Sequence, residues 1–163
     1  MTVVRVSLRL GHLVVPHHLA AVFSAAKRLM DRHTADLAQS ALAHMLEAGW
    51  YESHVRRIRR RNGERRAALL DAVKKHFGDR VIIAGADAGL NVVLWLRDVP
   101  RKNEPQLFEG ARANGIGVYP VDPLYIGTKH RPAIAGLVLG YAGVSLANIE
   151  RGVMGLARMA KKL

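Results

Sequence analysis

The sequence predicts an α+β protein with a small, mostly antiparallel sheet that helices cover on one side. Three observations carry this prediction. Apolar residues recur at helical spacing through the first half of the chain, short β-branched runs bounded by glycine follow, and helical spacing returns near the C-terminus. The length of 163 residues suits one domain, and a hydrophobic fraction of 50% is sufficient to build its core.

The first residues alternate between apolar and polar side chains, which is typical of a strand. The pattern runs from Val3 to Val15 and places Arg5 and Arg9 on one face. A transit peptide would need helical amphipathicity, so the alternation argues against one.

Three helices are expected next. Apolar spacing predicts helices from Pro16 to Met30, from Ala35 to Ala48 and from Tyr51 to Phe77. Gly49 and Gly78 follow the second and third of these, at positions where glycine commonly ends a helix.

The period then changes to that of strands. Val81 to Ala84 and Leu90 to Leu96 predict a hairpin-like pair, and further strands are expected from Ile116 to Tyr119 and from Leu137 to Ala142. A short helix is expected between them, from Glu104 to Asn114.

A final helix is expected after Ser145, which is a suitable N-cap. The core stripe of that helix is expected to consist of Ile149, Val153, Leu156, Ala160 and Leu163.

The charge balance is strongly basic, with 25 Lys and Arg against 13 Asp and Glu and a formal net charge of +12. Such a balance attracts phosphates, nucleic acid and acidic lipid, but it identifies no partner. The absence of cysteine excludes a disulfide framework, thiolate catalysis and cysteine-ligated zinc, and it favours a cytoplasmic location. The longest nearly apolar stretch, from Ile134 to Val144, is too short to span a bilayer, which takes about 20 residues, so no membrane role is expected.

Arginines are concentrated in the third expected helix, in the stretch HVRRIRRRNGERRAALL. Seven of them lie between Val55 and Arg66, with Glu64 as the one acid among them. Guanidinium groups match phosphate geometry, so this stretch could bind nucleic acid or other anions; it could equally be a solvated helix face. No aromatic residue lies among the arginines to stack on bases. The candidate nucleic-acid or anion-binding residues are Arg56, Arg57, Arg59, Arg60 and Arg61.

Other catalytic and metal-binding patterns are missing from the sequence. The eight histidines include no pair four residues apart, the separation that places two imidazoles on one helix face. The serines lack the context of a nucleophile elbow. Asp87, Asp98 and Asp122 lie near expected strand ends, where turn and cap roles are common. No metal site and no catalytic group are therefore predicted.

Five segments, in order, carry a resemblance to a known family. They read LRLGHLVVP, DRHTADLAQSALAHMLEAGWYESHVRRIRRRNGERRAALLDAV, AGLNVVLWL, GIGVYPVDPLY and LVLGYAGVSLANIERGV. This order resembles the C-terminal part of fold-type-I, pyridoxal-phosphate-dependent aminotransferases, and in particular the aminotransferase-like domain of MocR-type regulators. These regulators are a branch of the GntR transcription factors that fuses a winged helix-turn-helix to that domain. The resemblance implies that residues 1–16 are a remnant strand of the large cofactor-binding domain and that residues 17–163 form the small C-terminal domain.

The resemblance also implies what remains of the cofactor site. The family lysine that forms a Schiff base with pyridoxal phosphate falls on Thr2, which cannot form one. Arg9 matches the family arginine that contacts the cofactor phosphate, although by itself it could be a solvated cation on a strand face. The arginine that binds the substrate carboxylate in many family members falls on Val138, which also suits an ordinary buried strand position. Arg131 lies near enough in sequence to be considered as its substitute.

Three functions follow as open hypotheses. The first is a truncated, MocR-type aminotransferase-like domain that is catalytically inactive alone and needs no cofactor. It would act at most as an interaction or dimerisation module, and contact DNA only through a winged helix that this chain lacks. The second is part of a pyridoxal-phosphate-dependent aminotransferase completed by another chain or a missing N-terminal region, and the third is a basic nucleic-acid-binding protein. The expected partner is a second copy or a missing large domain, because the surface that packs on that domain would be exposed.

Overall fold

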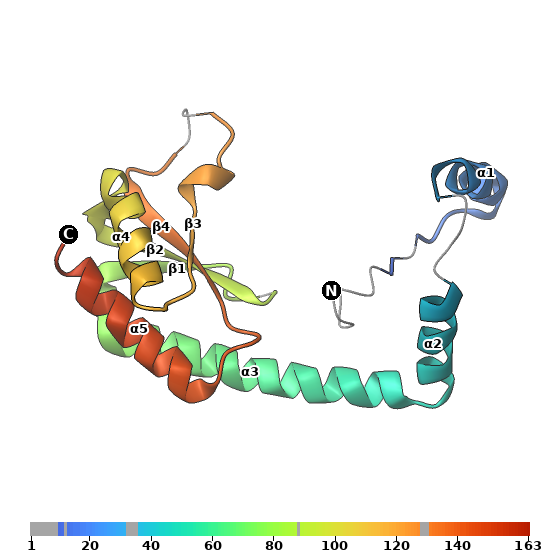
Figure 1. Ribbon diagram of the computed structural model, residues 1–163, viewed down its shortest axis with the longest axis horizontal. Helices are drawn as coiled ribbons and strands as arrows, with labels where there is room; N and C mark the ends of the chain where they lie inside the picture. The colour runs from blue at the N-terminus through green and yellow to red at the C-terminus, as the bar shows by residue number, and fades with distance from the viewer. Residues whose placement is uncertain (1–9, 12, 32–35, 88, 128–130) are drawn as a thin grey trace. The chain divides into compact units, whose positions relative to one another are not determined.

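A computed structural model describes the chain apart from residues 1–9, 12, 32–35, 88 and 128–130 (Figure 1). The chain divides into two units, Met1–Ile58 and Arg59–Leu163, and each is described by itself. The expected boundary between residues 16 and 17 falls inside the first unit and stays a prediction.

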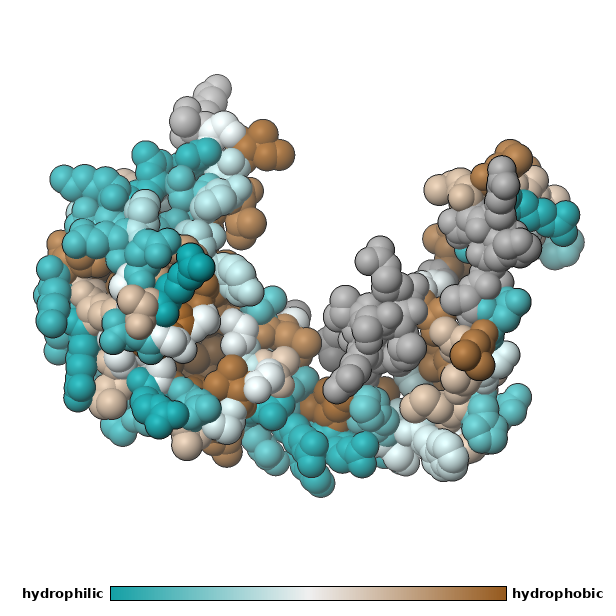
Figure 2. All heavy atoms as spheres, viewed as in Figure 1, coloured by the Kyte–Doolittle hydropathy of each residue, from teal (hydrophilic) through white to brown (hydrophobic). Residues whose placement is uncertain are grey.

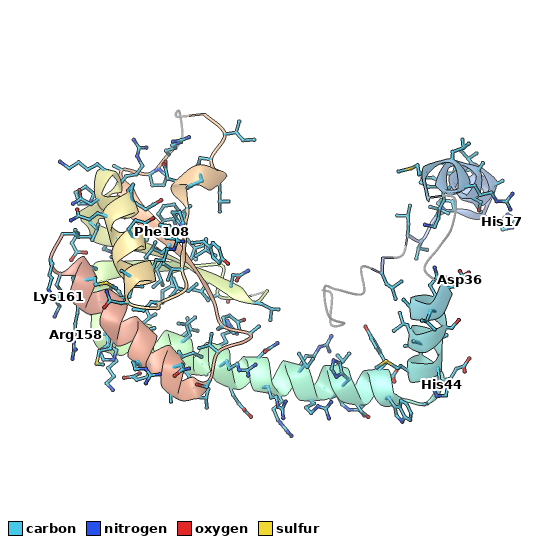
Figure 3. The ribbon with its side chains drawn as sticks, in the orientation of Figure 1. His17, Asp36, His44, Phe108, Arg158 and Lys161 are labelled. Atoms are coloured by element: carbon cyan, nitrogen blue, oxygen red, sulfur yellow. The ribbon has the colours of Figure 1, made fainter. Side chains whose placement is uncertain are left out.

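The three helices that the apolar spacing predicts are present, and the first unit contains two of them and the start of the third. A short 3-10 turn, η2 (His17–Leu19), leads into α1 (Ala20–Asp31), and α2 (Asp36–Glu47) precedes the start of α3 (Trp50–Phe77). Gly49 has a φ of 68°, a left-handed conformation that glycine adopts without steric cost, and it separates α2 from α3. At this corner the imidazole of His44, which is labelled in Figure 3, meets the Trp50 ring edge-on, with centroids 5.5 Å apart.

The strand expected from Val3 to Val15 is absent from the described part of that segment. Leu10, Gly11 and residues 13–16 have no regular secondary structure, and the rest of the segment lies outside the described residues. Alternation indicates which side chains share a face, but a strand also requires a neighbour for its backbone hydrogen bonds. None of the four described strands pairs with this segment.

The second unit contains a sheet of four strands in the order β1-β2-β4-β3. The strands are β1 (Val81–Ala84), β2 (Asn91–Pro100), β3 (Tyr119–Pro120) and β4 (Ile134–Gly140), and neighbouring strands are antiparallel. The expected hairpin is confirmed, with Val81 opposite Leu96 and Ala84 opposite Val93.

Helices cover one face of this sheet, as the sequence predicts. The residues buried on that face are Val92, Leu94 and Leu96 of β2 and Ala135, Leu137 and Leu139 of β4. They form one core with the C-terminal half of α3, with α4 (Glu104–Ala113) and with α5 (Leu146–Ala160) (Figure 1). The predicted α5 stripe is confirmed: Ile149, Val153, Leu156 and Ala160 are buried, and Leu163 packs partly buried against the core.

Two strand predictions need correction. The strand expected over residues 116–119 is reduced to β3, which contains only Tyr119 and Pro120. The backbone N–H of Ile116 instead donates to Ala111 O in the last turn of α4, at 2.9 Å, so it is unavailable to a sheet ladder. The strand expected over residues 137–142 begins earlier, at Ile134, and ends at Gly140.

Local contacts fix α5 at its start and against α3. Ser145 Oγ accepts a hydrogen bond from Asn148 N at 3.3 Å, which confirms the predicted N-cap. Glu150 Oε1 lies 2.8 Å from both Lys75 Nζ and His76 Nε2. The hydrogen bond from Lys75, and after it the one from His76, holds the pKa of Glu150 below its ordinary value of 4.5.

The face of the sheet opposite the helices carries Trp95 directly over Gly136. The two residues are register partners in β2 and β4. A Cβ at position 136 would stand 2.5 Å from Trp95 Cζ3 and 3.0 Å from Val121 Cβ. Glycine at this position therefore allows the indole to lie against the neighbouring strand.

The Gly136→Ala variant should be destabilised by about 1–3 kcal/mol, because the Trp95 indole must leave its position. The measurement is urea unfolding followed by circular dichroism. Gly152→Ala in α5 is the control, since its Cβ would meet Ile116 Cγ2 at an ordinary 3.9 Å and alanine favours the helix by up to about 1 kcal/mol. A Gly136→Ala variant as stable as the unmodified chain would contradict this account of the Trp95 contact.

Candidate functional site

The apolar face of the sheet opposite the helices is the candidate functional site and is called the open face. Its side chains include Ile82, Val93, Trp95, Tyr119 and Val138. Ile82 and Tyr119 are exposed, and the other three are partly buried. A contiguous apolar face of this kind is typical of a surface that contacts another domain or an apolar ligand.

Val138 lies between two strand neighbours on the open face, Val93 of β2 and Tyr119 of β3. It occupies the position where the family resemblance places the substrate arginine. A valine side chain has no donor for a carboxylate. Its partial burial is also less than an ordinary core strand position would show. Position 138 therefore offers no cation to a substrate carboxylate.

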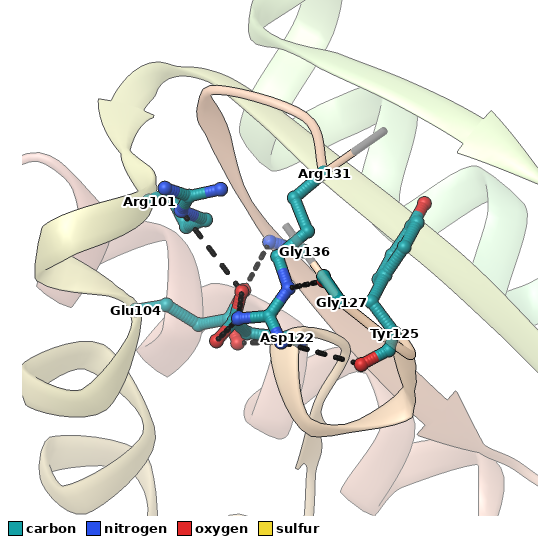
Figure 4. A network of polar contacts seen from close by, with 7 residues as sticks. All are labelled: Arg101, Glu104, Asp122, Tyr125, Gly127, Arg131 and Gly136. Carbon is teal, nitrogen blue, oxygen red and sulfur yellow. Dashed lines mark hydrogen bonds and ion pairs between the residues drawn. The ribbon is translucent and has the colours of Figure 1, made fainter. Parts of the chain in front are cut away.

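A buried carboxylate links two segments of the chain at the edge of the open face. Glu104, at the start of α4 and only 2% exposed, accepts hydrogen bonds from Gly136 N at 2.8 Å and from Asp122 N at 2.9 Å (Figure 4). The first donor belongs to β4 and the second follows β3, so this side chain bridges the two strands beyond the end of their ladder. Sequence reasoning missed Glu104, because an acid in the first turn of a helix is common and its partners are 18 and 32 residues away.

Arg131 is held by hydrogen bonds to residues 122–127, in the segment that follows β3. Its Nη1 donates to the two Asp122 carboxylate oxygens at 3.1 and 3.3 Å, its Nε donates to Gly127 O at 2.6 Å, and its Nη2 donates to Tyr125 O at 3.2 Å (Figure 4). Arg101 Nε adds an ion pair to Asp122 Oδ1 at 3.9 Å. Each nitrogen of the Arg131 guanidinium thus donates within the chain, which does not support Arg131 as a substitute for the substrate arginine.

The five candidate arginines of α3 are Arg56, Arg57, Arg59, Arg60 and Arg61, and all are exposed. Arg56 Nη2 donates to Ser53 Oγ at 3.1 Å, and Arg60 Nε lies 4.0 Å from Glu64 Oε1. Contacts of this kind between exposed side chains of one helix contribute little to stability. The role of these arginines in binding nucleic acid or other anions stays a prediction.

The positions that the resemblance assigns to pyridoxal phosphate lie at the start of the chain. Thr2 and Arg9, the positions that the resemblance assigns to the cofactor, lie outside the described residues. No lysine occurs in any of the four described strands. The phosphate-binding role of Arg9 therefore stays a prediction.

The described part of the chain shows neither a metal-binding cluster nor a membrane-spanning helix. No group of three or more His, Asp or Glu side chains there could hold a metal ion. No helix there is long and apolar enough to cross a membrane.

Comparisons with known proteins extend these observations. No model of a protein family matches the chain. It is 31% identical over 150 residues to the uncharacterized HTH-type transcriptional regulator YhdI of Bacillus subtilis, covering 92% of this chain and 31% of that protein. It is 30% identical over 150 residues to the probable rhizopine catabolism regulatory protein MocR of Rhizobium meliloti, covering 92% of this chain and 29% of that protein. The chain therefore spans about a third of the length of these relatives.

A solved structure matches over nearly the whole chain. It is LysN, an α-aminoadipate aminotransferase from Thermus thermophilus, with a TM-score of 0.79 and 25% identity over 98% of this chain and 40% of that one. The fold is thus that of the C-terminal part of a fold-type-I, pyridoxal-phosphate-dependent aminotransferase. The homologues in sequence are MocR-type regulators of the GntR family, and the chain matches their C-terminal aminotransferase-like domain.

The Glu104→Gln variant should be less stable by about 1–3 kcal/mol, because an amide offers one acceptor oxygen and leaves a buried backbone N–H unpaired. Urea unfolding measures the difference. Glu109→Gln is the matched control, since Glu109 is an exposed glutamate of the same helix and its change should stay within about 0.5 kcal/mol. Equal effects of the two substitutions would show that the Glu104 carboxylate does not hold the strands together.

Proposed function

We propose that this chain serves as the small-domain part of the effector domain of a MocR-type regulator, is catalytically inactive alone, and acts as an interaction or dimerisation module. Two of its relatives, YhdI and MocR, are named as regulators, which supports a regulatory role over that of a free-standing aminotransferase. Contact with DNA would come from a winged helix-turn-helix outside this sequence. The partner would be a second copy of the chain or a large aminotransferase-like domain.

The apolar surface of α1 and α2, which no other described element of the first unit covers, carries the proposal. No residue of α2 is buried, and residues 20–30 of α1 are all partly or fully exposed. The exposed apolar side chains include Phe23, Met30 at 82% and Leu37 at 87%, and Figure 2 shows brown patches over both helices. Burying one such side chain contributes about 1.5–3 kcal/mol. Several of them together strongly favour a bound partner over an exposed surface.

The length of these helices supports the same conclusion. α1 and α2 have 12 residues each, and isolated helices of about 12–15 residues are marginal in water. Most helical stability in proteins comes from packing an amphipathic face against something else. A partner that covers α1 and α2 would provide that packing.

The proposed lack of catalysis rests on missing chemical groups. Transamination requires pyridoxal phosphate as an electron sink and a lysine amine that anchors the cofactor and moves protons. By the family resemblance the lysine position is Thr2, and the substrate-arginine position is Val138. The alternative, half of an aminotransferase completed by another chain, would require that chain to bring the lysine.

We expect the chain to form a dimer or a larger assembly, as measured by light scattering over a concentration series. A double variant, Phe23→Glu with Met30→Glu, should shift the mass toward the monomer, because an unpaired charge is costly to bury. Ile126→Glu is the control, since this fully exposed side chain lies in the second unit, and the substitution should leave the mass unchanged. A monomeric unmodified chain at every concentration would count against a dimerisation module.

Addition of pyridoxal phosphate should produce no saturable Schiff-base absorption band, because no lysine occupies the family position. Borohydride reduction followed by peptide mass spectrometry should show weak labelling spread over exposed lysines such as Lys74 and Lys102. Stoichiometric labelling at a single lysine would overturn the proposal of inactivity and favour the aminotransferase alternative.

A further inference from the structure

A groove of about 670 Å³ opens on the helix-covered side of the sheet, within the second unit. Its walls are α5, the segment 114–118 after α4, and the end of β4. Its buried floor consists of Leu69, Val118, Leu139, Tyr141, Ile149 and Val153. Small-molecule sites typically have volumes of about 300–1,000 Å³ and a largely apolar lining, so the groove has the size and floor of one.

Two glycines of α5 shape the wall opposite Ile116. A Cβ at position 155 would stand 2.9 Å from Ile116 Cδ1, so this side chain lies almost against the helix backbone at that point. At Gly152, one turn earlier, the nearest atom to such a Cβ is Ile116 Cγ2, at 3.9 Å. The groove is therefore narrow beside Gly155 and wider beside Gly152, toward the start of α5.

The rim of the groove is cationic. Arg151 and Arg158 line it from α5 with the amides of Asn114 and Asn148, and no Asp or Glu is among the lining residues. The two arginines are seven residues apart, which places them on one side of the helix, about 10 Å apart along its axis.

Most of the hydrogen-bonding capacity of these arginines is unused within the described part of the chain. Arg151 Nη2 donates to Asn148 Oδ1, and Arg158 Nη2 lies 3.6 Å from Met154 Sδ, a weak acceptor. Neither arginine forms an ion pair with a described residue. Figure 3 shows Arg158 on α5 next to Lys161 near the C-terminal end of the helix, which adds a further positive charge.

We propose that this groove binds a small amphipathic carboxylate, with the apolar body on the floor and the carboxylate at the rim arginines. Guanidinium groups pair well with carboxylates, and the absence of acids from the lining removes competition for them. The site is distinct from the open face. Leu139 of the groove floor and Val138 of the open face are consecutive residues of β4, and their side chains point to opposite sides of the sheet.

The test is a titration of the 163-residue chain with sodium octanoate, followed by backbone amide chemical shifts. We expect saturable shifts at Gly115, Gly117 and Gly152, which line the groove, and no shift at Gly49, which lies in the first unit. 1-Octanol, which has the same chain length and no charge, should bind more weakly. Arg151→Gln and Arg158→Gln should each weaken octanoate binding by about tenfold, the usual effect of losing a charge-assisted hydrogen bond.

Arg112→Gln is the matched control, because Arg112 is an exposed arginine of α4 that does not line the groove. Octanoate affinity unchanged by this substitution, together with the losses at Arg151 and Arg158, would support the site. Shifts at Gly49 without shifts at the groove glycines would place octanoate on the bare first-unit helices and overturn the proposal. Equal binding of octanol and octanoate, or no binding of octanoate, would also overturn it. None of these outcomes depends on the regulatory role proposed above.

Discussion

The geometry of the second unit depends on a carboxylate buried at a sheet edge. β3 pairs with β4 over only two residues, and the chain then turns away in η5 (Asp122–Leu124). That turn would leave the backbone N–H groups of Gly136 and Asp122 without acceptors, and a buried unpaired donor costs about 1–3 kcal/mol. Glu104 accepts from both, and because it belongs to α4 the same contact fastens the helix to the sheet edge. The Arg131 segment that borders the open face is then attached through the Asp122 carboxylate.

Features encoded by local pattern could be predicted from the sequence, whereas features that depend on distant partners could not. The hairpin of β1 and β2, the Ser145 cap and the stripe of α5 follow from residue types within a few positions. The prediction of a strand over residues 116–119 was wrong because the N–H of Ile116 donates to Ala111 O at the end of α4. The strand-like pattern of these residues does not reveal that contact. The network of Glu104, Asp122 and Arg131 was likewise beyond sequence reasoning, since it joins a helix start, a turn and a strand. Val138 is the one residue named for the open face that has a candidate role predicted from the sequence, and that role comes only from the family resemblance.

The first unit shows the limit of a periodic pattern in another way. Apolar spacing correctly predicts α1 and α2, and it indicates which side of each helix needs cover. The pattern does not identify the partner, because any apolar surface of suitable shape could cover a stripe that includes Phe23 and Met30. In the second unit the corresponding stripe of α5 is buried by elements of the same unit, so a similar pattern leads to a closed core there. The helical patterns of the two units are alike. The units differ in whether other elements of the same unit are available to pack against the apolar stripe.

The two sides of the sheet can change function independently, because alternate residues of a strand face opposite ways. Val138 and Leu139 of β4 illustrate this: one lies on the open face, where the family resemblance places substrate binding, and the other forms part of the groove floor. Replacing an arginine by valine at position 138 alters the first side without repacking the second. The cationic rim of the groove comes from α5, so Arg151 and Arg158 cannot be remnants of the substrate arginine in β4. A valine at position 138 on the open face is therefore compatible with ligand binding on the side that the helices cover.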